Sequence, residues 1–151
     1  MERKNLVIVG GGSTYTLGII MSLIAEKETL PLKKLVFYDT DHVRQEKIAE
    51  ATKVILREEY PELDTFEYTT DKEKAFKDID VAFLQIRTGG LAMREKDEQI
   101  PLKYGVVGQE TCGPGGMAYG LRSITDMIEL VNDIRAYSKD AWIMNYTKPA
   151  A

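Results

Sequence analysis

Short apolar runs alternate along the chain with longer stretches in which apolar and polar residues are mixed. Five runs have the length and apolar character of strands, and they lie at residues 5–9, 34–39, 65–69, 80–86 and 141–146. Between them, apolar residues recur at the helical spacing of three and four. Strands that alternate with helices predict a parallel sheet with right-handed connections. The expected fold class is therefore α/β, a doubly wound, mostly parallel sheet with helices on both faces.

Each helical stretch has an apolar row that we expect to be buried. In the first stretch this row consists of Ile19, Leu23 and Ile24. In the second, which should end before Pro61, it consists of Val43, Ile48, Ala51 and Ile55. In a long helix expected at 116–137 it consists of Leu121, Ile124, Ile128, Val131 and Ile134. A short helix is expected at 71–76, with Asp71 as its N-cap.

Three glycines follow the first strand at once, and a helical pattern opens at Ser13 and Thr14. A strand that turns through glycines into a helix leaves main-chain N–H groups free at the positive end of the helix dipole, where a phosphate or pyrophosphate can bind. Gly10 and Gly12 match the first two glycines of the G-x-G-x-x-G pattern of Rossmann-like dinucleotide sites, whereas Tyr15 stands in place of the third. The alternative is a sharp turn that binds no ligand.

An acidic residue, Asp39, ends the second strand. In a Rossmann-like sheet an acid at this point accepts hydrogen bonds from the ribose hydroxyls of the adenosine, and it favours NAD over NADP because it repels a 2′-phosphate. Arg44 lies close enough to affect that choice, so it joins the candidate cofactor-binding residues. The alternative role for Asp39 is that of a helix cap or turn residue.

Residues 87–116 do not fit the simple alternation of strands and helices. They follow the carboxyl end of the strand at 80–86, the edge at which parallel sheets bind ligands. Four of the residues from 108 to 116 are glycine, which suggests that the backbone approaches a ligand and that the start of the long helix forms a second anion site. The alternative is a loop whose glycines serve only packing.

Several side chains near this loop are candidates for chemistry. Arg87 and Arg94 could bind a phosphorylated or carboxylated substrate through their guanidinium groups, although each could equally be a surface residue. Glu110 could orient a substrate or a water, or hold a structural hydrogen bond. Asn145, at the tip of the last strand, could present its amide to a ligand or close the strand end. Cys112 has no nearby metal-ligand partner, so we expect a packed, inert thiol.

Composition narrows the class of protein. A chain of 151 residues, 44% of them hydrophobic, fits one domain at 1–151. A net charge of −4 makes nucleic acid an unexpected partner. No apolar run reaches the ~18–20 residues of a membrane span, and Met1 to Lys4 leave no room for a signal peptide. The single cysteine suggests a reducing, cytoplasmic location.

Taken together, these segments closely resemble the amino-terminal part of the NAD-dependent glycoside hydrolase family 4, above all its 6-phospho-α-glucosidase branch. The resemblance covers essentially the whole chain and is most specific in the block around Gln109-Glu110-Thr111. The other segments that carry it are residues 10–16, 37–39, 92–105, 112–116 and 145–147.

The resemblance implies an unusual hydrolysis of phosphorylated disaccharides such as maltose 6′-phosphate. NAD takes a hydride from C3 of the sugar, a base then removes the C2 proton, and a divalent metal, usually Mn²⁺, stabilises the resulting enediolate. The glycosidic oxygen leaves by elimination, water adds and the hydride returns. This family is an exception to the two-carboxylate mechanism of most glycosidases.

The resemblance also implies roles for individual residues. Glu110 would be an essential active-site carboxylate, Arg94 would bind the sugar 6-phosphate, and Asn145 would approach the cofactor or the sugar. Asp39 would hold the ribose. The pyrophosphate would be held by Gly10, Gly12, Ser13 and Thr14.

The chain departs from the family pattern in two ways. Lys148 stands where the family has an asparagine that contacts the sugar. Family members are also much longer, and their metal ligands, catalytic Asp and Tyr base lie beyond residue 151, so no metal ligand is expected here. We therefore expect the NAD-binding part of a phosphoglucosidase that is a homo-oligomer at full length and inactive as this chain alone.

Two other functions remain open from the sequence. The first is a dinucleotide-binding module without catalysis. The second is a different NAD enzyme, such as a 2-hydroxyacid dehydrogenase, although such enzymes are not expected to carry the block around Glu110.

Overall fold

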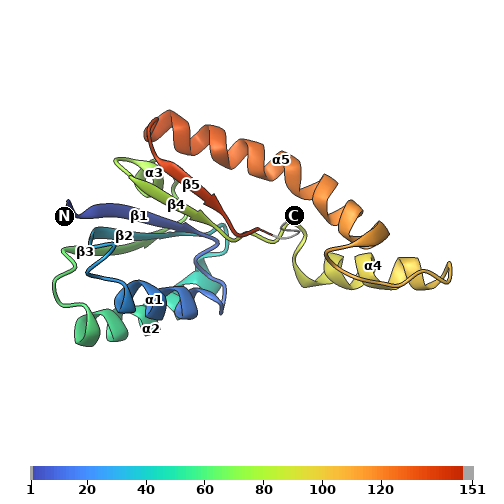
Figure 1. The fold of residues 1–151 in the computed structure, drawn as a ribbon, viewed down its shortest axis with the longest axis horizontal. Coiled ribbons are helices and arrows are strands. Elements are labelled where there is room, and N and C mark those ends of the chain that lie inside the picture. The colour runs from blue at the N-terminus through green and yellow to red at the C-terminus, as the bar shows by residue number, and fades with distance from the viewer. Residues whose placement is uncertain (1, 148–151) are drawn as a thin grey trace.

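The fold is built on a five-stranded sheet in which every neighbouring pair of strands is parallel (Figure 1). The computed structural model describes residues 2–147. The strand order is β3-β2-β1-β4-β5, so the order reverses between β1 and β4. The strands are β1 (Lys4–Val9), β2 (Leu32–Tyr38), β3 (Thr65–Thr69), β4 (Val81–Leu84) and β5 (Trp142–Asn145). This confirms the expected Rossmann-like α/β fold, with strand ends that differ from the prediction by two residues or fewer.

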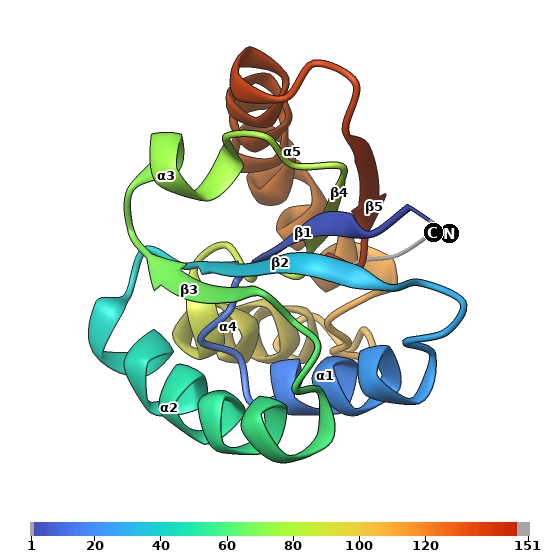
Figure 2. The same ribbon diagram turned by 90° about the vertical axis from the view of Figure 1, so that its left-hand side faces the viewer.

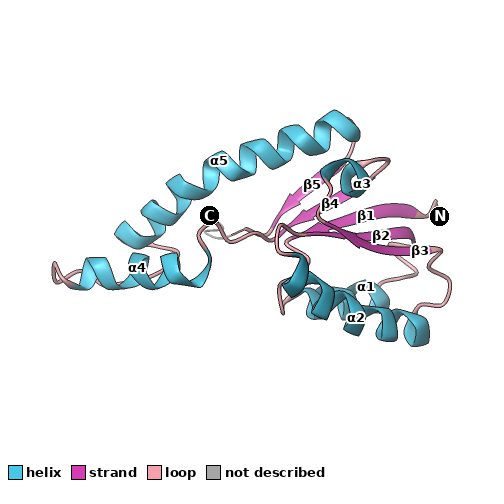
Figure 3. Cartoon of the chain, turned by 180° about the vertical axis from the view of Figure 1, so that it is seen from behind, coloured by secondary structure: helices cyan, strands magenta, loops and turns pink. Residues whose placement is uncertain are grey.

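Helices lie on both faces of the sheet, as Figure 2 shows. Two of them, α1 (Thr16–Ala25) and α2 (His42–Glu59), cover one face. The opposite face is covered by α3 (Lys72–Phe76) and by the second half of α5 (Gly113–Tyr137). The remaining helix, α4 (Gly90–Leu102), lies beside the first half of α5, beyond the carboxyl ends of the strands (Figure 3). We call residues 90–126 the arm.

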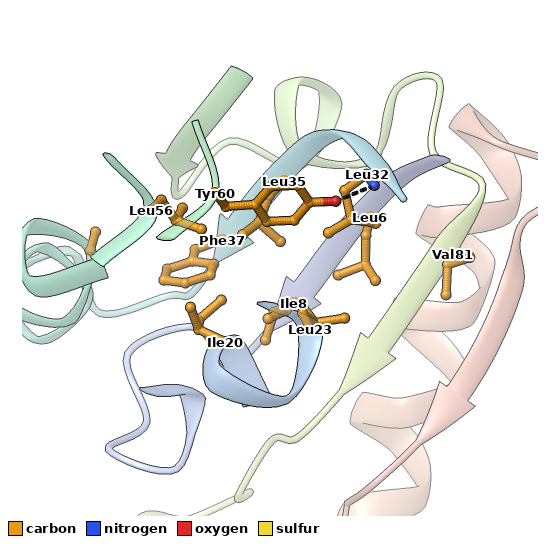
Figure 4. Packing of buried hydrophobic residues seen from close by; sticks show 11 residues of the cluster. Leu6, Ile8, Ile20, Leu23, Leu32, Leu35, Phe37, Leu56, Tyr60 and Val81 are labelled. Carbon is orange, nitrogen blue, oxygen red and sulfur yellow. Dashed lines mark hydrogen bonds between the residues drawn. The ribbon is translucent and has the colours of Figure 1, made fainter. Parts of the chain in front are cut away.

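The core is divided by the sheet into two apolar layers. In the layer under α1 and α2, Phe37 is fully buried and meets the ring of Phe66 edge-on at 4.9 Å. There the Tyr60 hydroxyl accepts a hydrogen bond of 2.7 Å from the main-chain N–H of Leu32 (Figure 4). In the other layer, Phe76 of α3 and Ile134 of α5 pack on the sheet. Both layers draw on β1 and β2, whose strands are buried on both faces.

The apolar row of the first helix and the N-cap of the third agree with the sequence prediction. Leu23 is buried, and Ile19 and Ile24 pack against the core of α1. The Asp71 carboxylate accepts from the main-chain N–H of Lys74 at 3.2 Å and so caps α3 as expected.

The apolar row predicted for α2 was wrong in two of its four members. Val43 is 64% exposed and Ala51 is also exposed, while Ile48 and Ile55 are half-buried. The helix buries Ala49 and Leu56 together with two polar residues, which a hydrophobic pattern cannot find. Gln45 donates to the carbonyl of Thr69 at 3.2 Å, and Thr52 donates to the carbonyl of Ile48 at 2.8 Å.

The buried row predicted for α5 was wrong in its first three members. Leu121, Ile124 and Ile128 are 53–61% exposed, whereas Val131 and Ile134 pack on the sheet. Leu121 and Ile124 belong to the first half of α5, which lies beyond the sheet and turns Tyr119 and Ser123 inward. The apolar row of that half faces outward. Ile128 lies in the second half and is exposed as well.

The sequence did not predict α4. Its two buried residues are Asp97 and Pro101, while its apolar residues Leu91, Ile100 and Leu102 are exposed, so no helical apolar row marks it. Within residues 2–147, no helix is both long enough and apolar enough to cross a membrane.

Candidate functional site

A cleft of about 1370 Å³ opens at the carboxyl edge of the sheet. It lies where the strand order reverses, which is the usual ligand site of a doubly wound sheet. Its walls come from the ends of β1, β2, β4 and β5, from the loop after β1, and from one side of α5. Seven of the sequence candidates line it: Gly10, Ser13, Thr14, Asp39, Arg44, Arg87 and Asn145.

The glycines after β1 let the loop pass between the neighbouring strands. Gly10 has φ +89°, and a Cβ there would lie 2.7 Å from the carbonyl oxygen of Gln85 at the end of β4. A Cβ on Gly11 would lie 2.6 Å from that of Phe37. The main-chain N–H groups of both glycines donate to the carbonyl of Tyr38. These glycines are therefore required by the close approach of β1 to its two neighbours.

The loop continues further than the sequence predicted. Helix α1 begins at Thr16 rather than at Ser13 and Thr14, because the Ser13 N–H turns back to the carbonyl of Gly10 at 3.1 Å. No hydrogen bond from the Thr14 N–H is found among the described residues, and Thr14 lines the cleft. An anion in the cleft can therefore accept from this group at the start of α1.

Asp39 and Arg44 both contact Gly12. The Asp39 carboxylate accepts from the Gly12 N–H at 2.9 Å and from the Asp41 N–H at 3.0 Å. Arg44 donates from Nε to the carbonyl of Gly12 at 2.7 Å. The turn role considered for Asp39 is thus present, and the same residue lines the cleft. Gly12 is not among the residues that line the cleft, and its N–H donates to Asp39.

A second group of charges surrounds Glu110, whose side chain is only 13% exposed. Arg87 lies 2.9 Å and Arg94 3.0 Å from the same oxygen, Oε2, and Arg94 also pairs with Glu98 at 2.7 Å. The hydrogen bond to Glu98 and then the charge of Glu110 raise the pKa of Arg94. Of the three residues Arg87, Arg94 and Glu110, only Arg87 lines the cleft. Arg87 therefore joins the cleft to this cluster.

The glycines at 108–116 pack against the chain itself. A Cβ on Gly108 would lie 1.8 Å from the carbonyl oxygen of Glu98, and one on Gly115 would lie 2.4 Å from that of Asp97. A Cβ on Gly116 would lie 2.5 Å from the carbonyl oxygen of Thr111, and Gly113 has φ +64°. The packing alternative therefore accounts for these glycines without a ligand.

Cys112 is exposed, so the expected packed thiol was wrong. It occupies the N-cap position of α5. This position precedes the buried turn that begins at Gly115.

The sequence did not single out Tyr119, which lies near both Arg87 of the Glu110 cluster and Arg122 of the arm. It is 2% exposed, and its ring lies between the guanidinium carbons of Arg87 at 5.6 Å and Arg122 at 5.5 Å. Arg122 in turn pairs with the buried Asp97 at 2.6 and 3.3 Å. Burial raises the pKa of the Tyr119 hydroxyl. The i, i+3 spacing of Tyr119 and Arg122 was the available signal in the sequence.

Lys72 is a second residue that the sequence did not single out. It lines the cleft and pairs with Asp133 of α5 at 2.6 Å, and this hydrogen bond raises the pKa of Lys72. Its position depends on how α3 and α5 pack beside each other on the same face of the sheet, which no local pattern encodes.

The described residues do not fit a divalent metal. Within 2–147, no three or more His, Cys, Asp or Glu side chains gather in a way that could hold one. Lys148, the departure from the expected asparagine, lies outside the described residues.

The sequence model of a protein family, family 4 glycosyl hydrolase, matches residues 5–151, nearly the whole chain. The chain belongs to this family. Maltose-6′-phosphate glucosidase of Bacillus subtilis is 53% identical over 153 residues that include all of this chain and 34% of the relative. The family 4 chain described here thus spans about a third of the length of this relative.

Two solved structures of family 4 enzymes have the same fold. A 6-phospho-α-glucosidase from gut microorganisms, in complex with NAD and Mn²⁺, is 54% identical with a TM-score of 0.95, covering 99% of this chain and 34% of that one. The 6-phospho-β-glucosidase of Thermotoga maritima, with NAD and glucose 6-phosphate, is 34% identical with a TM-score of 0.90, covering 99% and 35%.

Proposed function

We propose that this chain, residues 1–151, is the NAD-binding domain of a 6-phospho-α-glucosidase and that the cleft at the carboxyl edge of the sheet holds the cofactor. The observation that carries the proposal is the convergence of the Thr14 N–H, the Asp39 carboxylate and the Asn145 amide on one cleft. The pyrophosphate is placed at the start of α1 beside Ser13 and Thr14, and the adenosine ribose at Asp39. NAD in the related 6-phospho-α-glucosidase structure supports this assignment.

In this proposal, the residues of this chain bind NAD and the phosphorylated sugar and orient them toward each other. Bound NAD would supply a hydride acceptor for the sugar that later returns the hydride. Arg94, and Arg87 at the border of the cleft, would hold the phosphate of the sugar, since guanidinium groups bind such anions in a forked geometry. Glu110 holds both arginines in place and stands beside that phosphate site as the family's essential carboxylate. No step is assigned to a metal, because the described residues offer no donor set for one.

The α-linked substrate is part of the proposal. Identity is 54% to the 6-phospho-α-glucosidase from gut microorganisms and 34% to the 6-phospho-β-glucosidase of Thermotoga maritima. The substrate class that follows is a 6-phosphorylated α-glucoside such as maltose 6′-phosphate.

A titration of NAD⁺ into the chain, followed by calorimetry, tests the cofactor site. We expect saturable binding of one NAD⁺ per chain. Thr14→Glu places a carboxylate at the expected pyrophosphate position and should weaken binding at least tenfold, whereas Thr29→Glu makes the same change at the other end of α1 and should not. The assignment would be contradicted if the wild-type chain bound no NAD⁺ at millimolar concentration. It would also be contradicted if both variants lost the same amount of affinity for NAD⁺.

Hydrolysis by the chain alone gives a second test. Because the chain spans 34% of the length of its relatives, we expect no turnover of maltose 6′-phosphate with NAD⁺ and Mn²⁺. A measurable release of glucose 6-phosphate would mean that the chain contains a complete active site.

Two further expectations remain proposals. A homo-oligomer at full length is supported by the edge strand β5, where Trp142 is 74% exposed. A cytoplasmic location is supported by the single cysteine. Light scattering of the full-length protein tests the first, and fractionation of the source cell tests the second.

A further inference from the structure

Gly12 is held on both sides by the residues that follow β2. Its N–H donates to Oδ2 of Asp39 at 2.9 Å, and its carbonyl accepts from Nε of Arg44 at 2.7 Å. Both bonds join a main-chain group to an ionised side chain, and such bonds are the stronger kind. They tie the middle of the glycine loop to the start of α2, a segment more than 25 residues away in the sequence.

The Asp39 side chain and the main chain of Arg44 are held by further hydrogen bonds. Asp39 accepts from the Asp41 N–H through its other oxygen, and the Asp41 carboxylate caps α2 by accepting from the Arg44 N–H at 3.0 Å. The turn between β2 and α2 is therefore stabilised by hydrogen bonds among its own residues, in addition to its bonds to the glycine loop.

A side chain on Gly12 would crowd these contacts. A Cβ on Gly12 would lie 2.9 Å from Oδ2 of Asp39 and 3.2 Å from Cγ of Arg44. A side chain at Gly12 would therefore disturb the contacts that hold the loop.

The cations that line the cleft all have partners in the described part of the chain. Arg44 bonds Gly12, Lys72 pairs with Asp133, and Arg87 pairs with Glu110. The Nε of Arg44 is therefore engaged by the loop.

We propose that Asp39 and Arg44 form a clamp on Gly12 that holds the loop at residues 10–15 in the conformation that offers the Thr14 N–H to a dinucleotide. Arg44 is a positioning residue in this proposal, and it acts through Gly12 and not through contact with the cofactor. The inference rests on the proposed NAD site. In this proposal Asp39 alone sets the preference for NAD over NADP, and Arg44 does not contribute to it.

Binding of NAD⁺ and NADP⁺ to Arg44→Ala, Arg44→Lys and the control Arg57→Ala tests the clamp. Loss of one bond to a charged group predicts roughly tenfold weaker binding of both cofactors to Arg44→Ala, about 1.4 kcal/mol, with their affinity ratio unchanged. Arg44→Lys should recover part of the loss, and Arg57→Ala, at an exposed site near the end of α2, should lose nothing. A loss confined to NADP⁺ would show direct contact with the 2′-phosphate and overturn the proposal, as would no loss at all.

Amide hydrogen exchange without cofactor separates the clamp from the proposed function. Arg44→Ala should speed exchange at residues 10–15 relative to the wild type and to Arg57→Ala, whether or not NAD binds. Unchanged exchange there overturns the clamp even if the wild-type chain binds NAD⁺. Faster exchange in a wild-type background that binds no NAD⁺ would keep the clamp and reject the cofactor site.

Discussion

The apolar side chains of β1 and β2 are almost completely buried, whereas the arm at residues 90–126 exposes most of its apolar side chains. Leu6 and Ile8 are fully buried, but Leu91, Val107 and Leu121 are 61–78% exposed. The arm is held instead by the Asp97–Arg122 ion pair and by close backbone contacts at its glycines. The sheet thus folds by burying apolar area, and the arm keeps its shape through a few polar and steric contacts.

The largest effect should come from removing a core ring in the sheet. Phe37→Ala deletes a fully buried side chain and is expected to lower the free energy of unfolding by about 3–5 kcal/mol. Leu121→Ala in the arm, at 61% exposure, should change it by less than about 0.5 kcal/mol. Urea unfolding followed by circular dichroism measures both, with Phe37→Leu as the milder variant if the first fails to fold. Similar losses at the two sites would remove the contrast between the regions.

The second effect concerns the ion pair of the arm. Asp97→Asn leaves the Arg122 guanidinium without its charge partner, which should cost about 2 kcal/mol locally. Amide hydrogen exchange in α4 should then rise roughly 30-fold, while exchange in β1 stays unchanged. Glu98→Gln next to it removes a half-buried partner of Arg94 and should have a smaller effect. Faster exchange in β1 as well would mean that arm and sheet unfold together.

The third effect concerns two glycines in the two regions. Gly115→Ala would bring a Cβ to 2.4 Å from the carbonyl oxygen of Asp97, so it should destabilise the protein by roughly 1–2 kcal/mol. Gly18→Ala meets nothing within 4 Å in α1 and should stabilise it by about 0.5–1 kcal/mol, since alanine favours the helix. Thermal unfolding that moved both variants in the same direction would contradict the packing role of Gly115.

The smallest effect is on pH dependence. Burial raises the pKa of Tyr38 in the sheet and of Tyr119 in the arm above the ordinary value of 10.0. The folded state then keeps a proton that the unfolded state has lost, so stability falls as the pH rises above 10. Tyr119→Phe should reduce this loss in the arm and leave that of the sheet. Unfolding free energies at pH 9 and pH 11, with exchange to locate the change, measure it.

The sequence predicted the sheet well because its strands are apolar runs bounded by clear turns. It also selected residues that meet in one cleft, since Gly10, Asp39 and Asn145 each follow or end a strand and parallel strands share their carboxyl edge. The roles proposed for these residues in binding stay predictions.

The arm could not be predicted in the same way. Helix α4 buries Asp97 and Pro101, and its contact with α5 depends on glycines whose purpose is visible only when both partners are placed. The exposed row of α5 and the engagement of Arg94 with Glu110 have the same cause. The hydrophobic pattern of one segment shows which of its residues are apolar, but it does not show which other segment packs against them.

Helix α5 is continuous over 25 residues, or about 37 Å. Its later turns rest on the sheet through Ile134, its middle lines the cleft with Asp126 and Leu130, and its first turns belong to the arm. A stiff rod anchored at one end behaves as a lever. A small tilt of its far end would therefore change the width of the cleft along its middle, so the packing of the arm and the shape of the cleft are joined through one helix.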